Sequence, residues 1–283
     1  MPLVALRDEP PLVRGYLRAM RLRDVVGSRV SATFDAVWLG LLYGDALARV
    51  DAHYFQTVRE TYGGRDDPYL QPGWNEQGLF DWEREAVAGF FPPSGRVVVT
   101  AAGAGREVLA LCEAGFDATG YEPNGALRAY GADLLAAHGH PGRLHAMARD
   151  AFPAEARECD AVVVGWGSYT NLSSRAVRIA FLDAARRRLP YGGRVLISFF
   201  PRREGEWYAA YVARWAGRIR RTLRRPAPEE GDTLQPNFVH RFTRREIGEE
   251  AAAAGMTVIH AADAPYGHAV LERGRDGQPA AES

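Results

Sequence analysis

The sequence predicts an α/β fold, with a seven-stranded and mostly parallel sheet, an antiparallel last strand, helices on both faces and an N-terminal helical cap. Three observations lead to this prediction. From residue 96 onward, short apolar runs alternate with amphipathic segments, which is typical of parallel sheets covered by helices. Only a turn separates the last two apolar runs, so the last strand is expected to be antiparallel to its neighbour. The first 93 residues carry apolar side chains at mixed 3- and 4-residue spacings, which indicates helices.

The individual elements follow from β-branched runs and from residues typical of helix ends. Gly115 and Gly139 come just after two helices, where a left-handed cap favours glycine. Thr243 and Glu246 have the spacing of a capping box at a helix start. The predicted strands cover residues 96–100, 117–121, 143–147, 160–165, 193–199, 256–261 and 268–272. The helices between them cover residues 105–114, 124–138, 173–189 and 243–254.

Three regions divide the chain. Residues 1–93 are the expected helical cap, with helices at 13–23, 31–59 and 79–91; residues 94–273 are the sheet domain, and residues 274–283 are a polar tail. Residues 201–240 interrupt the alternation and are expected to form an inserted lid with an amphipathic helix. Its apolar stripe consists of Trp207, Tyr208, Tyr211, Val212, Trp215 and Ile219. A basic stripe beside it, Arg214, Arg218, Arg221 and Arg225, is either a solvated face or a surface for an acidic substrate or carrier.

The composition excludes several function classes. The chain has 283 residues, 47% of them hydrophobic, and its formal net charge is zero, which gives no broad electrostatic surface for nucleic acid. All 35 basic residues are arginine, so neither a Schiff-base lysine nor a P-loop lysine is present. Cys112 and Cys159 lie far apart in apolar contexts, and no metal site is predicted. The sequence shows neither a signal peptide at its start nor an apolar run of membrane-spanning length, and it predicts a cytoplasmic protein.

The most informative segment is the turn after the first predicted strand. The apolar run 96–100 is followed by Ala101, Gly103 and Gly105, after which a helix begins. Small residues allow the backbone to approach a ligand closely. Glu122 ends the second predicted strand, where its carboxylate can accept hydrogen bonds from two ribose hydroxyls. The segment therefore predicts a nucleoside site.

Two further segments also follow predicted strands. Asp150 comes after the third strand, and a loop with Trp166 and Tyr169 comes after the fourth. Because open α/β sheets bind ligands at the carboxyl ends of their strands, these residues are expected at the same edge as Glu122. Other interpretations stay open: Asp150 as a turn or capping residue, and the two aromatic residues as core.

The order of these segments resembles that of the class I S-adenosylmethionine-dependent methyltransferases, and the resemblance covers residues 96–273. It implies that Ala101, Gly103 and Gly105 form the glycine-rich turn that holds the cofactor. The Gly-Gly turn before the fifth strand and the closing antiparallel strand match the same family. The other residues that the resemblance assigns to the cofactor site are Glu122, Pro123, Asp150, Ala151, Phe152 and Trp166.

The resemblance also implies a role for several of these residues. Glu122 would bind the ribose hydroxyls of S-adenosylmethionine. Asp150 would accept a hydrogen bond from the adenine amino group, the amide of Ala151 would face a ring nitrogen, and Phe152 would lie against the ring.

The chain departs from the family at two positions. Ala101 replaces the first glycine of the turn, and Val99 stands where the family has an acidic residue that helps hold the methionine end of the cofactor. Another group must then bind the cofactor's ammonium. The candidates are Glu76, Asp81 and Glu83, in the segment that leads into the sheet domain, although Glu83 is also interpreted as a first-turn helix carboxylate.

Substrate contacts are expected from Tyr62, Trp74 and Tyr169, because aromatic faces suit flat apolar groups and cations. A general base is needed only if the nucleophile arrives protonated. His240 and Tyr169 are the predicted catalytic residues, and His53 and Tyr62 are also considered for this role.

These observations predict a methyltransferase that acts on a small molecule, by in-line transfer to oxygen or nitrogen in a capped pocket. The alternative from another enzyme class is an NAD(P)-dependent oxidoreductase, but it requires a glycine or alanine where the chain has Val108. A non-catalytic protein that binds S-adenosylmethionine, and a peptide or carrier-bound substrate, also stay open. No nucleic-acid or membrane partner is expected, and the oligomeric state is not predicted.

Overall fold

The computed structural model describes residue 15 and residues 27–42, 68–235 and 237–274. The helix expected at 13–23, most of the one at 31–59, and the tail beyond residue 274 lie outside this part, as do His53 and Tyr62. The chain divides into two compact units. A sheet unit takes Arg65–Pro201 and Phe242–Ser283, and a smaller unit takes Met1–Gly64 and Arg202–Arg241.

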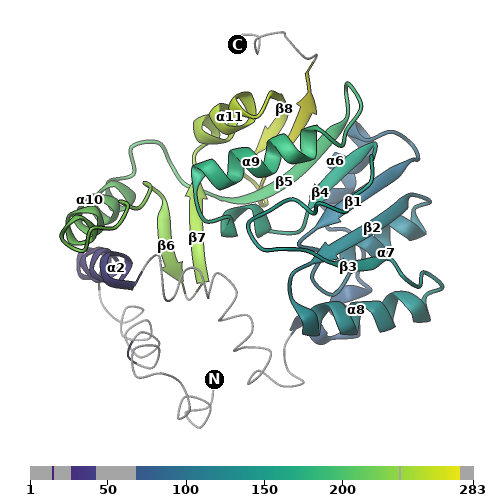
Figure 1. Cartoon of the computed structure of the whole chain (residues 1–283), viewed down its shortest axis with the longest axis horizontal. Helices are drawn as coiled ribbons and strands as arrows, with labels where there is room; N and C mark the ends of the chain where they lie inside the picture. The colour runs from purple at the N-terminus through teal and green to yellow at the C-terminus, as the bar shows by residue number, and fades with distance from the viewer. Residues whose placement is uncertain (1–14, 16–26, 43–67, 236, 275–283) are drawn as a thin grey trace. The chain divides into compact units, whose positions relative to one another are not determined.

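The described part of the sheet unit contains one mixed sheet with the strand order β3-β2-β1-β4-β5-β9-β8 (Figure 1). Strands β1 to β5 pair in parallel, and β9 is antiparallel to both β5 and β8. The prediction of a mostly parallel sheet closed by an antiparallel strand is therefore confirmed. The strands are β1 (Arg96–Thr100), β2 (Asp117–Glu122), β3 (Leu144–Ala146), β4 (Ala161–Val164), β5 (Arg194–Pro201), β8 (Met256–Ala262) and β9 (Gly267–Arg273).

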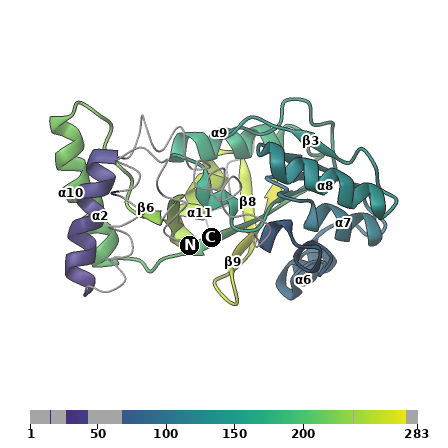
Figure 2. The same ribbon diagram turned by 90° about the horizontal axis from the view of Figure 1, so that it is seen from below.

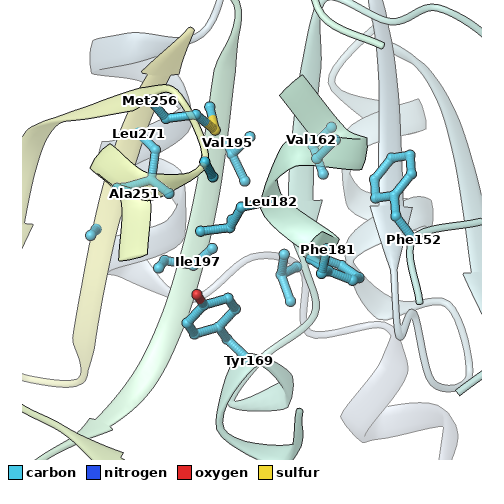
Figure 3. Close-up of a cluster of buried hydrophobic side chains, with 14 of the residues drawn as sticks. Phe152, Val162, Tyr169, Phe181, Leu182, Val195, Ile197, Ala251, Met256 and Leu271 are labelled. Carbon is cyan, nitrogen blue, oxygen red and sulfur yellow. The ribbon is translucent and has the colours of Figure 1, made fainter. Parts of the chain in front are cut away.

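Apolar side chains leave the sheet on both faces and build two core clusters. On β1, Val97 and Val99 belong to one cluster and Val98 to the other, as expected from the alternation of side chains along a strand. Figure 3 shows Phe181 and Leu182 of a covering helix in the second cluster. Helices α9 (Arg175–Arg186) and α11 (Arg244–Ala253) contribute to this second cluster, and α6 (Asp81–Phe90), α7 (Arg106–Glu113) and α8 (Gly125–Ala137) contribute to the first.

Capping residues fix where several of these helices begin and end. Asn124 caps α8 through its side chain, and Thr243 with Glu246 forms the predicted capping box of α11. Gly115 and Gly139 follow α7 and α8 with φ of 91° and 83°, which confirms the predicted left-handed caps.

The helix α6 belongs to the sheet unit and not to a separate cap. Trp82 and Val87 of α6 are buried in the same cluster as Val97 of β1. The sheet unit therefore includes residues 65–93, which the sequence placed in the cap, because the apolar face of α6 packs in the core of the sheet.

The smaller unit contains a helix pair and a hairpin in its described residues. They are α2 (Ser28–Leu42), α10 (Trp207–Thr222), β6 (Asp232–Gln235) and β7 (Asn237–Phe242), of which β7 runs on into the sheet unit. Helices α2 and α10 lie side by side (Figures 1 and 2), and a Cβ at Gly40 would lie only 2.7 Å from Cβ of Ile219. The helix α10 was predicted and the hairpin was not. None of the described helices combines the length and apolarity that crossing a membrane requires.

Candidate functional site

The turn between β1 and α7 has the left-handed backbone that its small residues predict. Ala101, Gly103 and Gly105 all have positive φ, of 50°, 56° and 91°. A Cβ built at Gly103 would meet no atom within 4 Å, so the backbone angle and not the lack of space favours glycine there. The turn is therefore open on the side of Gly103.

Two close approaches hold this turn in place. A Cβ at Gly165, just after β4, would lie 2.2 Å from the carbonyl oxygen of Ala101. A Cβ at Gly131 of α8 would lie 2.6 Å from the carbonyl oxygen of Ala104. Since real Cβ atoms do not approach so closely, only glycine lets the chain pass on these two sides of the turn.

Glu122 ends β2 and is hydrogen-bonded to the turn. Its Oε2 accepts from the amide of Gly103 at 2.8 Å, and its Oε1 accepts from the amide of Asn124 at 2.8 Å. The residue is only 4% exposed. A carboxylate has about four lone-pair sites, so it can accept several hydrogen bonds at once. Pro123 follows it, half-buried.

The residues after β3 lie in a turn. Asp150 has a φ of 55°, as an aspartate in a turn often has, and it is exposed, so the turn interpretation holds for its backbone. Ala151 is also exposed, whereas Phe152 is 8% exposed and packs edge-on against Phe181 in the core, with ring centroids 5.6 Å apart. Contacts of these residues with adenine remain a prediction.

Trp166 lies in a cluster of aromatic rings next to the end of β4. Its ring centroid is 4.9 Å from that of Tyr266, 5.8 Å from that of Phe80 and 6.0 Å from that of Trp74. Trp74 was predicted to contact the substrate and Trp166 to contact the cofactor. The fold brings these two residues together, although they lie in distant segments of the chain. Both interpretations of Trp166, ligand contact and packing, are compatible with its half-buried position.

Tyr169 was predicted to contact substrate and to act as a base, and the structure corrects both predictions. Its side chain is fully buried, in the core beside Phe181 and Ile197 (Figure 3). Its hydroxyl donates to Glu250 Oε2 at 2.8 Å, and Arg178 pairs with the same carboxylate at 2.7 Å. Burial, together with the Glu250 charge, raises the pKa of Tyr169 well above its ordinary value. The hydroxyl has neither access to a substrate nor a pKa suited to a base.

The carboxylates considered for the cofactor's ammonium are engaged elsewhere. Asp81 pairs with Arg84 on the surface, and Glu76 lies 3.3 Å from His138. Glu83 is buried in a bidentate pair with Arg106, so both of its oxygens already accept hydrogen bonds.

Sequence reasoning missed Arg106 and Glu107, which begin α7. Oε1 of Glu107 accepts from Arg106 at 2.8 Å and from the amide of Trp166 at 3.1 Å. Burial lowers the pKa of the Arg106 guanidinium, but Glu107 and Glu83 outweigh this effect and raise it above its ordinary value. The sequence signal that could have identified these two residues is an adjacent pair of opposite charges directly after a glycine turn.

In the smaller unit, the hairpin places Asp232 directly opposite His240. Nδ1 of His240 lies 2.7 Å from Oδ1 of Asp232, and the two side chains are 1% and 0% exposed. The hydrogen bond orients the imidazole ring of His240 towards the carboxyl group of Asp232. Burial raises the pKa of Asp232, against the lowering effect of His240. The sequence singled out His240 but not Asp232, because the hairpin that pairs them was not predicted.

Glu229 completes a group with these two residues, in which potential metal-ligand atoms lie within 4.8 Å of one another. The direct hydrogen bond between Asp232 and His240 accounts for their closeness without an ion.

No model of a known protein family matches the chain, and no curated protein sequence matches it significantly. Solved structures do match. One is an S-adenosylmethionine-dependent methyltransferase from Methanosarcina mazei, with a TM-score of 0.53 and 14% identity over 70% of this chain and 99% of that one. A sugar N-methyltransferase from Streptoalloteichus sp. has a TM-score of 0.51 and 21% identity over 83% and 96% of the two chains. A third, an S-adenosylmethionine-dependent methyltransferase from Clostridium acetobutylicum, has a TM-score of 0.51 and 10% identity over 79% and 99%.

These likenesses agree with the strand order and with the antiparallel strand β9. The chain has the class I, Rossmann-like fold of the S-adenosylmethionine-dependent methyltransferases.

Proposed function

We propose that the protein is an S-adenosylmethionine-dependent methyltransferase of the cytoplasm that acts on a small molecule. The observation that carries this proposal is the buried Glu122 carboxylate, held at 2.8 Å by the amide of Gly103 at the carboxyl ends of β1 and β2. Ligands of open α/β sheets bind at this edge. An acceptor fixed in this way is ready to bind two vicinal hydroxyls of a ribose without first losing side-chain freedom.

The residues at this edge fit an adenosyl group. The turn is open beside Gly103, where a Cβ would meet no atom within 4 Å. The exposed carboxylate of Asp150 has no hydrogen bond or ion pair with another described residue, and it can accept a hydrogen bond from an amino group. Bound S-adenosylmethionine supplies a methyl group on an activated sulfonium, so the chain's part is to bind, orient and exclude water.

The packing beside the turn disfavours a nicotinamide cofactor. Dinucleotide-binding folds place a small residue where this chain has Val108, which lets the helix approach the first strands closely. Here Val108 is fully buried, and its Cγ2 would lie 2.6 Å from a Cβ at Gly120 of β2. In this chain the small residue at the contact is Gly120 of the strand, and the helix carries the larger Val108, which is the reverse of the dinucleotide-binding arrangement.

His240 is the proposed general base for a nucleophile that arrives protonated. Asp232 orients the ring through the hydrogen bond to Nδ1, and a substrate would have to reach the ring at a place where the His240 side chain is 1% exposed. The similar structure from Streptoalloteichus is that of a sugar N-methyltransferase, which supports a small polar substrate with an amino or hydroxyl nucleophile.

Calorimetric titration with S-adenosylhomocysteine, and separately with NAD⁺ and NADP⁺, tests the cofactor. We expect saturable binding of S-adenosylhomocysteine and none of the nicotinamides. Binding of a nicotinamide alone would refute the proposal.

Transfer of a labelled methyl group to extracts of the source organism then tests turnover and identifies the substrate. Asp232→Asn should lower kcat because the amide keeps an acceptor oxygen but loses the negative charge that favours a protonated ring, while the affinity for S-adenosylhomocysteine stays unchanged. A protein that binds the cofactor product but labels nothing in any extract would be a binding protein without turnover.

A further inference from the structure

Three charged side chains lie buried together where α7 begins. The guanidinium of Arg106 contacts Glu83 at 2.7 Å and Glu107 at 2.8 Å. None of the three side chains is more than 6% exposed. With both carboxylates ionised, one positive and two negative charges give the group a net charge of −1.

The two carboxylates are not equally satisfied. Oε2 of Glu83 accepts from Arg106 and from the amide of Phe80, and Oε1 accepts from Arg106 again. Oε1 of Glu107 also accepts twice, from Arg106 and from the amide of Trp166. No described residue donates to Oε2 of Glu107. Oε2 of Glu107 is therefore the atom of this group that can accept a hydrogen bond from a cationic ligand.

A buried and uncompensated charge is costly, and a cation beside it removes that cost. Burial and then the Glu107 charge raise the pKa of Glu83, against the lowering effect of Arg106. This direction is the one expected where carboxylates outnumber cations.

The position of Glu107 relates this group to the candidate cofactor site. Glu107 follows the glycine turn by two residues, and its carboxylate is bound to the amide of Trp166, which follows β4. Gly165, the residue before Trp166, lies against the carbonyl of Ala101, so the segments that follow β1 and β4 are in close contact here. Glu122 lies across the same turn, at the end of β2.

Resting on the proposed function, we propose that Glu107 binds the α-ammonium group of S-adenosylmethionine. The ribose is bound at the β2 side of the turn by Glu122, and the amino-acid end is bound at the β4 side by Oε2 of Glu107. The ammonium neutralises the excess charge of the buried group. Glu107 thus replaces the acidic residue that the family has at position 99 and that helps hold the methionine end of the cofactor. Val99 has no acceptor for the ammonium and is fully buried among apolar side chains.

The test compares two ligands that differ in the amino-acid end. S-adenosylhomocysteine carries the ammonium, and 5′-methylthioadenosine has the same nucleoside without it. Both are titrated calorimetrically into the wild-type protein and into Glu107→Gln, which keeps the shape and the acceptor oxygen of the side chain but removes its charge. Glu113→Gln, the same change at an exposed position of α7, is the matched control.

We expect Glu107→Gln to weaken S-adenosylhomocysteine by about tenfold or more, the effect of losing a hydrogen bond to a charged acceptor. Its affinity for 5′-methylthioadenosine should stay within about twofold, since that ligand has no ammonium to lose. Glu113→Gln should leave both affinities unchanged.

Other results overturn the inference in distinguishable ways. Equal weakening of both ligands by Glu107→Gln, or no weakening of either, would show that Glu107 does not bind the ammonium and would leave the proposed function intact. Failure of the wild-type protein to bind either ligand would overturn the proposed function itself. Thermal unfolding of each variant checks that it is folded.

Discussion

The amide of Gly103 donates to Oε2 of Glu122 at 2.8 Å, although 19 residues separate the two in the chain. This bond joins the turn after β1 to the end of β2. It fixes the position of the carboxylate at the carboxyl ends of the two strands. The Glu122 carboxylate is therefore already ordered before a ligand binds to it.

Glu122→Ala should weaken the binding of S-adenosylhomocysteine by about 1.5–3 kcal/mol, the range for hydrogen bonds to a charged acceptor. The variant also leaves the amides of Gly103 and Asn124 without their acceptor, so its melting temperature should fall. Calorimetric titration measures the first effect and a thermal melt the second. Unchanged affinity in a folded variant would mean that the ribose binds elsewhere.

Tyr169→Phe should destabilise the protein and leave catalysis alone. The hydroxyl donates to the buried Glu250 carboxylate, so its loss should cost about 1.5–3 kcal/mol of unfolding free energy. Denaturant unfolding gives this value, and methyl transfer by the folded variant should retain the wild-type kcat. A selective loss of kcat with unchanged stability would return Tyr169 to the active site.

Arg178→Met should cost about 3–5 kcal/mol, because it leaves the Glu250 charge buried without its partner. Arg175 provides the control on the same helix. It pairs with Glu249 at 3.0 Å, but both side chains are about two-fifths exposed, at 43% and 39%. Arg175→Met should therefore cost less than about 1 kcal/mol. Equal losses for the two variants in urea unfolding would contradict the assignment of a buried pair.

His268 should make the protein less stable in mild acid. Burial lowers its pKa in the folded state, and its ring packs on Trp82 with centroids 4.8 Å apart. The unfolded chain therefore binds more protons than the folded one as the pH falls below the unfolded pKa, about 6.5. Stability is retained above that pH and decreases below it, until the folded histidine is protonated too.

The measurement is the melting temperature at pH 7.5 and 5.5, for the wild type and for His268→Asn. Asparagine can replace the donor that Nδ1 offers to the carbonyl of Tyr266 at 2.8 Å, but it does not titrate. The difference between the two pH values should shrink in this variant and not in His140→Asn. A difference that persists in full would place the acid sensitivity in other groups.

The fold could be predicted from the sequence because its signals are local. Alternating apolar runs gave the strands, and Gly115, Gly139, Thr243 and Glu246 marked helix ends by their own backbone and side-chain preferences. The position of Glu122 beside the glycine turn could be predicted for the same reason, since the turn and the next strand end are close in the chain.

The rest depended on contacts that no local pattern encodes. Tyr169 follows β4 as a site residue would, but the short helix Ser168–Asn171 turns it into the core towards Glu250, 81 residues away. Asp232 becomes a partner of His240 only when β6 and β7 pair. From the sequence alone, Glu107 has the pattern of a solvent-exposed residue in the first turn of a helix. Its burial beside Arg106 is known only from the structure.

The construction of the smaller unit has a consequence for the order of events on the ribosome. The hydroxyls of Thr33 on α2 and Tyr211 on α10 lie 3.1 Å apart, but 178 residues separate them in the chain. At usual rates of translation, α2 leaves the ribosome roughly 10–40 s before its partner helix has been synthesised. Strands β1 to β5 emerge within this interval. The nascent chain thus carries α2 without α10 through most of its synthesis, and the smaller unit is completed only after these five strands have been made.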